Sequence, residues 1–450
     1  MTTPTEPPIE PRPRRSPVAA VAGTFGANVG AAVLGLANVL IISRALGPTG
    51  RGSVVFLMTM AMLVSTLATL GIQKANGTFG AARPAARSAL ATNSVLFSVL
   101  LGGLSALAVL ALIAGVPSVG ADSDPKLRWL VLGFAPVAIL SNYLWNLAQS
   151  DYRFAVTNLV WLLPPVVNVA VNGVLAAMGA LTVTSAILVW LAGQTAGTLV
   201  MVWYVARRLS GFGRPDPRLG RETLAFGAKT HLGTVGMLGN FRLDQWLLGS
   251  IAGAHALGLY SVAVAWAEVL FFLPTALVIV QRPDLVRASP REAGRQAAVA
   301  FRACAVVTVG LAGAMALAAP FLCVTVFGDE FRGSIPDLRL LLIGGLGVVA
   351  LKLLGNALTC QGKPLLETAG VMVAFAVTVA LDIALIPLFD DRGAAVASAA
   401  AYSAGGLAMA VIFVRRLRTP PKELLPRGDE GALLYRKLRG TVRRPAGASR

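Results

Sequence analysis

Residues 125–133 read PKLRWLVLG and residues 336–344 read PDLRLLLIG, so two segments 211 positions apart agree at most positions. Two further pairs of segments keep nearly the same offset: LGPTGRG at 46–52 with AGAHALG at 252–258, and ARRL at 206–209 with VRRL at 414–417. Any single pair could be a coincidence between apolar stretches, but three pairs in the same order are hard to explain by chance. The pattern indicates that the second half of the chain repeats the first.

The composition is that of an integral membrane protein. Of the 450 residues, 56% are apolar and 13% charged, and the mean hydropathy is +0.71. A helix that crosses a bilayer needs about 20 mainly apolar residues, and backbone groups in hydrocarbon must be paired internally. We therefore expect an all-α polytopic protein. The twelve predicted spans are 18–43, 52–73, 88–116, 127–149, 155–179, 183–206, 223–250, 258–280, 297–327, 339–360, 366–388 and 393–414.

The repeat divides the spans into two groups of six. Because six is even, both groups have the same orientation and form parallel repeats about an axis along the membrane normal. The predicted organisation is a disordered N-terminal tail (1–17), an N-terminal lobe (18–206), a linker (207–222), a C-terminal lobe (223–414) and a basic C-terminal tail (415–450).

Basic residues are unevenly distributed between the connecting loops. With the N-terminal tail in the cytoplasm, the inner segments hold 30 of the 39 Lys and Arg residues and the outer loops hold 7. This bias predicts a multi-pass plasma-membrane protein with both termini in the cytoplasm. The net charge of +18 then reflects topology, and we expect no nucleic-acid partner.

Besides the charges near span ends, which are counted with the loops, five ionisable residues are embedded in predicted spans, all in the second lobe: Arg242, Asp244, Glu268, Lys352 and Asp382. Charges at such depth cost several kcal/mol when they face lipid, so they should face the bundle interior or a hydrated space. Two interpretations remain open. Either these residues line a polar cavity, or Glu268 and Lys352 form an ion pair that fixes helix packing while the other charges reach toward the membrane surface.

Metal and catalytic motifs are not evident. The three cysteines and the two histidines, His231 and His255, have no spacing typical of metal ligands. Acidic residues of the outer loops are dispersed. We therefore expect no metal, no cofactor and no enzymatic activity.

The sequence resembles the multidrug/oligosaccharidyl-lipid/polysaccharide (MOP) exporter superfamily, and most of all its branch of polysaccharide repeat-unit flippases. The resemblance covers residues 20–416 and rests on SRALGPTGRGSVVF (43–56), FRLDQWLLGSIAGAHALGLYSVAVAWAEVL (241–270), VFGDEFRGSIPDLRLL (326–341) and the RRL that closes each half. It implies two six-helix lobes in a V shape around a central cavity. The implied cargo is a polyprenyl-pyrophosphate-linked oligosaccharide, moved from the inner to the outer leaflet.

The resemblance also suggests roles for the charged residues. Arg44 matches the arginine before the LGP element, and together with Arg242 and Lys352 it is a candidate for binding the anionic headgroup. Asp244, Glu268 and Asp382 are candidates for coupling to an ion or a proton, or for salt bridges.

Other functions remain as alternatives. Within the superfamily these are a peptidoglycan-precursor (lipid II) flippase and an ion-coupled multidrug antiporter. Outside it they are a membrane glycosyltransferase or ligase and a non-transporting scaffold. Expected partners are the lipid-linked substrate, a polysaccharide polymerase or glycosyltransferases, and anionic inner-leaflet lipids at the basic tail.

Overall fold

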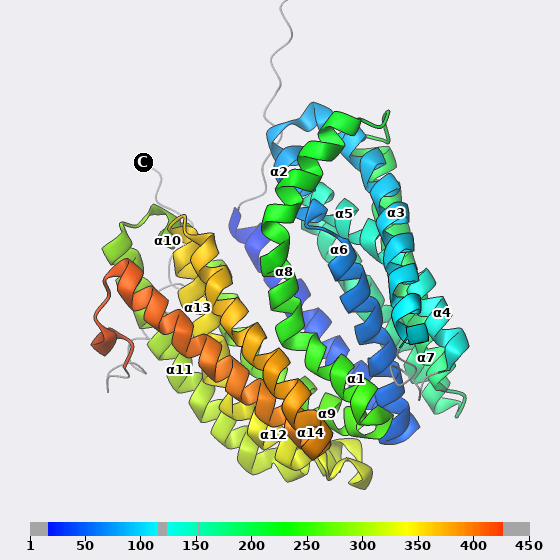
Figure 1. Ribbon diagram of the computed structural model, residues 1–450, viewed down its shortest axis with the longest axis vertical. Helices are drawn as coiled ribbons and strands as arrows, with labels where there is room; N and C mark the ends of the chain where they lie inside the picture. Colours follow the sequence, from blue (N-terminus) through cyan, green and yellow to red (C-terminus); the bar gives the residue numbers. More distant parts are fainter. Residues whose placement is uncertain (1–16, 116–123, 152–153, 426–450) are drawn as a thin grey trace, which may run out of the picture.

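The computed structural model describes residues 17–115, 124–151 and 154–425, and these form helices joined by short turns (Figure 1). The predicted N-terminal tail and most of the basic C-terminal tail lie outside the described residues. The first half contains α1 (Pro17–Ala68), α2 (Ile72–Ala82), η1 (Pro84–Ala86), α3 (Arg87–Gly115), α4 (Pro125–Gly133), α5 (Ala135–Gln149), α6 (Phe154–Ala177), α7 (Val183–Tyr204) and the π-helical turn η2 (Val205–Leu209). The second half contains α8 (Pro217–Ile251), α9 (Gly253–Ala267), η3 (Glu268–Phe271), α10 (Phe272–Arg287), α11 (Pro290–Pro320), η4 (Phe321–Thr325), η5 (Asp329–Phe331), α12 (Ser334–Ile343), α13 (Gly345–Cys360), α14 (Pro364–Leu417) and η6 (Pro421–Glu423).

The all-α polytopic fold is confirmed. Among the described residues, 9 helical segments are long and apolar enough to cross a membrane. Two of them, of 46 and 54 residues, are each a pair of helices joined at a bend. The 35-residue α8 is long enough but too polar to be counted by hydropathy. Dividing the two bent segments and adding α8 gives the twelve expected spans.

Both bends have a local backbone cause. In α1 the bend is at Gly47, whose φ of 64° is easily adopted only by a residue without a side chain, and Pro48 follows it. In α14 it is at Asp390, which takes φ 49°. Each bend turns the chain back and lets one continuous helical segment supply two antiparallel spans.

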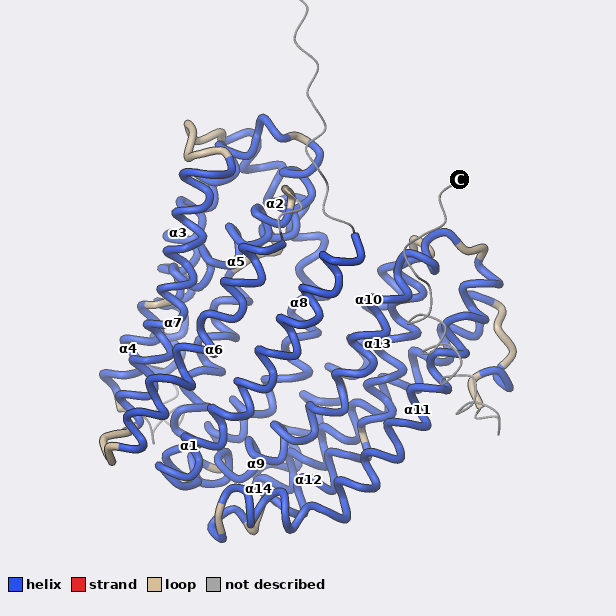
Figure 2. The backbone as a smooth tube through the Cα atoms, turned by 180° about the vertical axis from the view of Figure 1, so that it is seen from behind, coloured by secondary structure: helices blue, strands red, loops and turns tan. Residues whose placement is uncertain are grey.

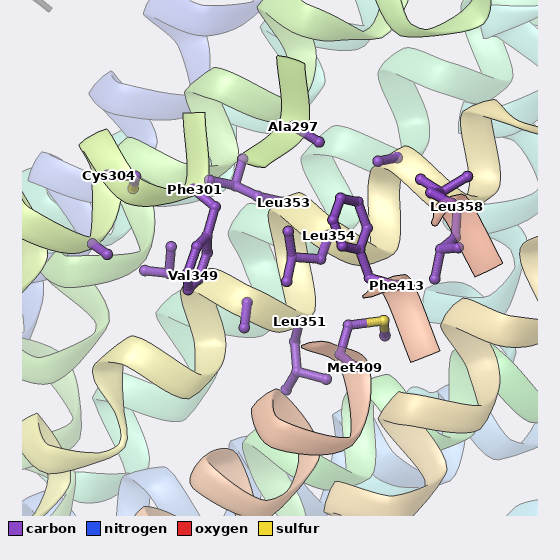
Figure 3. Packing of buried hydrophobic residues seen from close by; sticks show 14 of the residues in the cluster. Ala297, Phe301, Cys304, Val349, Leu351, Leu353, Leu354, Leu358, Met409 and Phe413 are labelled. Carbon is purple, nitrogen blue, oxygen red and sulfur yellow. The ribbon is translucent and has the colours of Figure 1, made fainter. Parts of the chain in front are cut away.

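The helices form two bundles that meet at one end and diverge at the other (Figures 1 and 2). α9, α12 and the bend of α14 lie at the joined end, whereas α2 and α10 lie at the open end. Each bundle has its own apolar core. In the C-terminal lobe, Phe301, Leu354, Met409 and Phe413 bring α11, α13 and α14 together (Figure 3).

The joined end is built from one of the repeated motifs. LGPTGRG at the bend of α1 and AGAHALG at the start of α9 pack against each other across the two lobes. A Cβ atom on Gly52 would lie 1.7 Å from the carbonyl oxygen of Ala254, and a Cβ on Gly258 would lie 1.9 Å from that of Pro48. Only glycine permits backbones to approach so closely, so the paired glycines of the repeat make the contact between the lobes.

α8 packs on both lobes. In its first part, a Cβ on Gly227 would meet the carbonyl oxygen of Leu70 at 2.5 Å, and Glu222 pairs with Arg83 at 2.8 Å. Further along, Gly236 and Gly239 lie against Met372 and Phe375 of α14. The sequence-based division assigns 223–250 to the second lobe, but the first turns of α8 pack on the first.

The linker before α8 is fixed to α3. Asn93 exchanges two hydrogen bonds with the backbone of Asp216, at 2.8 and 3.1 Å. Asp216 in turn accepts hydrogen bonds from the backbone N–H groups of Arg218 and Leu219, and Pro217 takes the first helical position. These are the usual signals of a helix start, and they begin α8 at 217, earlier than the apolar pattern predicts.

We expect Gly258→Ala to destabilise the protein, because its Cβ would meet the backbone of Pro48. The cost of such overpacking is about 1–3 kcal/mol. Thermal unfolding of the purified protein should show a Tm several degrees lower. Gly313→Ala in α11 is the matched control, since a Cβ there meets nothing within 4 Å. Equal Tm values for the two variants would show that the glycine contact does not stabilise the joined end.

Candidate functional site between the lobes

Arg242 and Glu268 form an ion pair beside the joined end. The Nη1 atom of Arg242, on α8, lies 2.7 Å from Oε1 of Glu268, which opens the short turn η3 between α9 and α10. Their side chains are 24% and 33% exposed, although both lie well inside helical segments of the bundle. The pair is therefore partly exposed and is not sealed in the apolar core.

Arg51 of the first lobe faces this pair. Its guanidinium Nε donates to the Ser261 hydroxyl of α9 at 3.2 Å, and its charge is close enough to repel that of Arg242. Arg51 is buried, and the Ser261 hydroxyl is the side-chain hydrogen-bond partner that the structure gives its guanidinium. Its contacts place the Arg242–Glu268 pair at the boundary between the lobes.

The sequence alone did not single out Arg51. Position 51 falls in the polar connection between the predicted spans 18–43 and 52–73, where an arginine is ordinary. The available signal was its place inside LGPTGRG, the motif that the repeat matches with AGAHALG.

Lys352 of α13 lies near the same pair. Its Nζ atom is 6.0 Å from the centre of the Phe241 ring, a distance at which a cation is attracted to the ring face. Glu268 attracts Lys352 electrostatically, but the closest cation to Glu268 is Arg242. Of the two interpretations that the sequence left open, a direct ion pair between Glu268 and Lys352 is not what this conformation has, because Arg242 of α8 pairs with Glu268 instead.

Asp244 points away from Arg242, into the C-terminal lobe. Its Oδ2 accepts hydrogen bonds from the hydroxyls of Tyr260 at 2.5 Å and Ser398 at 3.1 Å. A spacing of two residues puts side chains on different faces of a helix, so Arg242 and Asp244 have separate partners. Asp244 is thereby held by neutral donors from α9 and α14.

Asp382 is the least compensated of the embedded acids. It lies on α14 with none of its surface exposed, and neither carboxylate oxygen has a hydrogen-bond partner among the described residues. Asp244 is its charged neighbour, and the two carboxylates repel each other. Two buried acids without a cation between them are costly, unless a proton or a cation is shared.

Arg44 is not part of this cluster. It lies on the first leg of α1 at the joined end, and its guanidinium donates to the backbone carbonyls of Val326 at 2.7 Å and Thr325 at 2.8 Å. The structure thus brings Arg242, Glu268 and Lys352 together, sets Asp244 and Asp382 beside them in the second lobe, and leaves Arg44 elsewhere.

Metal coordination has little support in this arrangement. Within residues 17–115, 124–151 and 154–425, no group of three or more His, Cys, Asp or Glu side chains could hold a metal ion. Cys304, Cys323 and Cys360 are free thiols. The arrangement offers instead three basic side chains around Glu268 and two buried carboxylates, Asp244 and Asp382.

Residues 41–336 match the model of a family described as polysaccharide biosynthesis protein. The chain belongs to this family. The match runs from α1 of the first lobe to the start of α12 in the second, and it includes Arg44, Arg51, Arg242 and Glu268. No curated protein matches the chain significantly.

Solved structures share the fold at low sequence identity. The lipid II flippase MurJ in an inward closed conformation is 12% identical, with a TM-score of 0.72 over 94% of this chain and 93% of that one. An inward-facing multidrug resistance MATE transporter of the MOP superfamily is 14% identical, with a TM-score of 0.68 over 88% and 98%. A MOP superfamily transporter from Pyrococcus furiosus is 14% identical, with a TM-score of 0.64 over 89% and 95%. The expected two-lobed fold of the MOP exporter superfamily is therefore confirmed.

The Arg242–Glu268 pair should behave as one unit in a double-mutant cycle. Either Arg242→Ala or Glu268→Ala leaves one charge unpaired at the lobe boundary, so each should lower the stability of the protein. The double variant should be more stable than the sum of the two losses predicts. Because both side chains are partly exposed, we expect a coupling of about 1–2 kcal/mol from thermal unfolding. Strictly additive losses would mean that the two charges do not interact in the membrane.

Proposed function

We propose that the protein is a flippase that moves a polyprenyl-pyrophosphate-linked oligosaccharide from the inner to the outer leaflet of the plasma membrane, for cell-surface polysaccharide synthesis. The supporting observation is the partly exposed cationic cluster at the lobe boundary, in a chain of the polysaccharide biosynthesis family with a MOP transporter fold. A sugar and a pyrophosphate cannot enter hydrocarbon unaided. A polar surface between two lobes shields such a headgroup while its lipid chain stays in the membrane.

The charge balance of the cluster suits an anion. Arg51, Arg242 and Lys352 supply three cations and Glu268 supplies one acid, while Asp244 is held by hydroxyl groups on the far face of α8. The five embedded residues found from the sequence are two basic and three acidic, and Arg51 makes the basic and acidic residues equal in number. The cluster itself is cationic because Asp244 and Asp382 have their surroundings in the interior of the second lobe. The forked donors of arginine also match phosphate oxygens. Glu268 holds Arg242 in place until a phosphate competes for it.

The charge of the loops supports an orientation of the chain in the membrane, and the membrane potential supports outward transport in that orientation. The open end carries the arginine-rich segments around 207–222 and 282–295, and we assign it to the cytoplasm, with both termini on that side. A membrane potential that is negative inside favours outward movement of an anion by about 2.3 kcal/mol per charge per 100 mV. The conformation with a joined outer end then corresponds to the state that receives substrate.

Asp244 and Asp382 form the proposed coupling site. Both are buried, they repel each other, and Asp382 has no donor among the described residues. The Ser398 hydroxyl adds an oxygen, and Thr378 lies one turn before Asp382 on α14. Oxygen atoms of this kind suit a hard monovalent cation or a proton. A cation or proton bound between Asp244 and Asp382 would link α8 to both legs of α14.

The other candidate functions differ from this one in what the cluster must recognise. A lipid II flippase would handle a lipid of the same pyrophosphate chemistry with a different headgroup, so a direct comparison of the two lipids distinguishes them. A multidrug antiporter would prefer organic cations, which three basic side chains disfavour. A glycosyltransferase or ligase would form a sugar bond in liposomes without any partner, and a scaffold would change nothing there.

Lys352→Ala tests the headgroup site. Lys352 makes no salt bridge among the described residues, and its contact with the Phe241 ring is weak at 6.0 Å, so its removal should lower the Tm only slightly while it weakens anion binding. In liposomes with a pyrophosphate-linked oligosaccharide lipid, we expect flipping to fall about tenfold, the effect of one lost charge-assisted contact. Lys126→Ala, an exposed lysine at the start of α4, is the control.

Two results would contradict the proposed function. One is flipping at the wild-type rate by all three single variants, Lys352→Ala, Arg242→Lys and Arg51→Lys. The other is normal outer-leaflet labelling of lipid-linked repeat units in a strain that lacks the protein. Faster flipping of lipid II than of the oligosaccharide lipid would favour the peptidoglycan alternative.

Asp382→Asn tests the coupling site. A cation bound between Asp244 and Asp382 should raise the Tm of the purified protein in NaCl above its value in choline chloride of equal ionic strength. A shared proton should instead raise the Tm as the pH falls. Either effect should be lost in Asp382→Asn and kept in Asp329→Asn, whose carboxylate is exposed near the joined end. A wild-type Tm that responds to neither Na⁺ nor pH would refute coupling at this pair.

A further inference from the structure

Arg44 makes a contact between the lobes that neither the headgroup cluster nor the carboxylate pair requires. Its Nε donates to the carbonyl of Val326 at 2.7 Å and its Nη2 to that of Thr325 at 2.8 Å. Arg44 belongs to α1 in the first lobe. The two carbonyls belong to the helical segment of α11 and η4 in the second lobe, which ends before Gly328 with its φ of 118°.

Both acceptors lie in the last turn of a helix. Carbonyls there have no partner within the helix, and they carry the negative end of its dipole. A guanidinium offers two donors in a fixed fork, which fits two successive carbonyls. Arg44 therefore caps a helix of the opposite lobe with two charge-assisted hydrogen bonds.

The surroundings of this contact also cross the boundary between the lobes. Val39 and Leu40 of α1 pack on a cluster that includes Val262, Phe327 and Phe331 of the second lobe. Any separation of the lobes at the joined end would divide this cluster and break both hydrogen bonds of Arg44. The contact can exist only while that end is joined.

We propose that Arg44 is a latch that stabilises the conformation in which the outer end is joined, and that it is not a headgroup ligand. The proposal rests on the lobe movement of the proposed function. It adds which contact stabilises the conformation with the joined outer end. Without the latch, the protein should open more often at this end, whatever its substrate is.

Arg332 provides a matched control at the same end of the molecule. It pairs with Asp329 of its own segment at 2.9 Å, and the two side chains are 71% and 83% exposed. Among the described residues, Arg332 has no ion pair with the first lobe. Arg332→Ala therefore removes an arginine from the same end of the molecule but leaves the contacts of Arg44 intact.

The test measures how often the joined end opens. Val262→Cys, in a protein with its three native cysteines replaced by alanine, places a thiol at a position with none of its surface exposed, inside the cluster that opening divides. A charged thiol reagent can then react only in the open form, so the labelling rate of protein in nanodiscs is proportional to the open population. No substrate is needed, so this result is independent of the cargo.

We expect Arg44→Ala to raise the labelling rate about tenfold, the effect of losing a charge-assisted hydrogen-bonded contact. Arg44→Lys, which keeps the charge but loses the fork, should give an intermediate rate, and Arg332→Ala should match the parent protein. In a second protein that retains only Cys304, a thiol of the C-terminal core, Arg44→Ala should leave labelling slow. Equal rates for Arg44→Ala and Arg332→Ala, or faster labelling of Cys304 to the same degree, would overturn the latch. Loss of flipping with an unchanged opening rate would also count against it.

Discussion

The close approach of two helix starts at the joined end determines the rest of the architecture. Gly52 and Gly258 let the backbone of each lobe touch the other, at points where any side chain would collide with a carbonyl oxygen. In a membrane there is little hydrophobic drive between helices, so packing at short range and polar contacts must hold them together. The glycine contact puts Arg51 next to Ser261, and the Arg242–Glu268 pair follows at the same boundary.

α8 distributes the embedded charges between two environments. Arg242 faces the lobe boundary, where it is partly exposed and paired with an acid, whereas Asp244 faces the interior of the second lobe, where hydroxyl groups hold it. The two sites thus lie on one rigid helix, only two residues apart. A cation or proton that shifts α8 relative to α14 would also shift Arg242 relative to Arg51. In the proposed mechanism, α8 would therefore connect the coupling site to the headgroup site directly, without a chain of intermediate residues.

The sequence predicted the spans, the repeat and the superfamily because these depend on patterns that survive in one dimension: apolar length, loop charge and motif order. It did not predict which charges meet. Glu268 pairs with Arg242 and not Lys352 because of the rotation of α8, and periodicity does not specify that rotation. Arg51 was hidden in a polar motif that reads as a loop. Arg44 was assigned from its motif alone. Its acceptors are backbone carbonyls 281 and 282 residues away, and because every residue has a backbone carbonyl, the residue types there do not indicate the contact.

The crossing of α8 limits how the chain can be recombined. A duplicated unit suggests two exchangeable modules with a boundary at the linker, but the first turns of α8 pack on α2 and α3 and the linker is tied to Asn93. The physical module that begins at α1 therefore extends past the linker to about the middle of α8. A chimera joined at residue 207 would pair the start of α8 with a foreign surface, whereas one joined near residue 232 keeps each helix surface with its native neighbour. The same packing of α8 on the first lobe would limit the evolution of such proteins by exchange of halves.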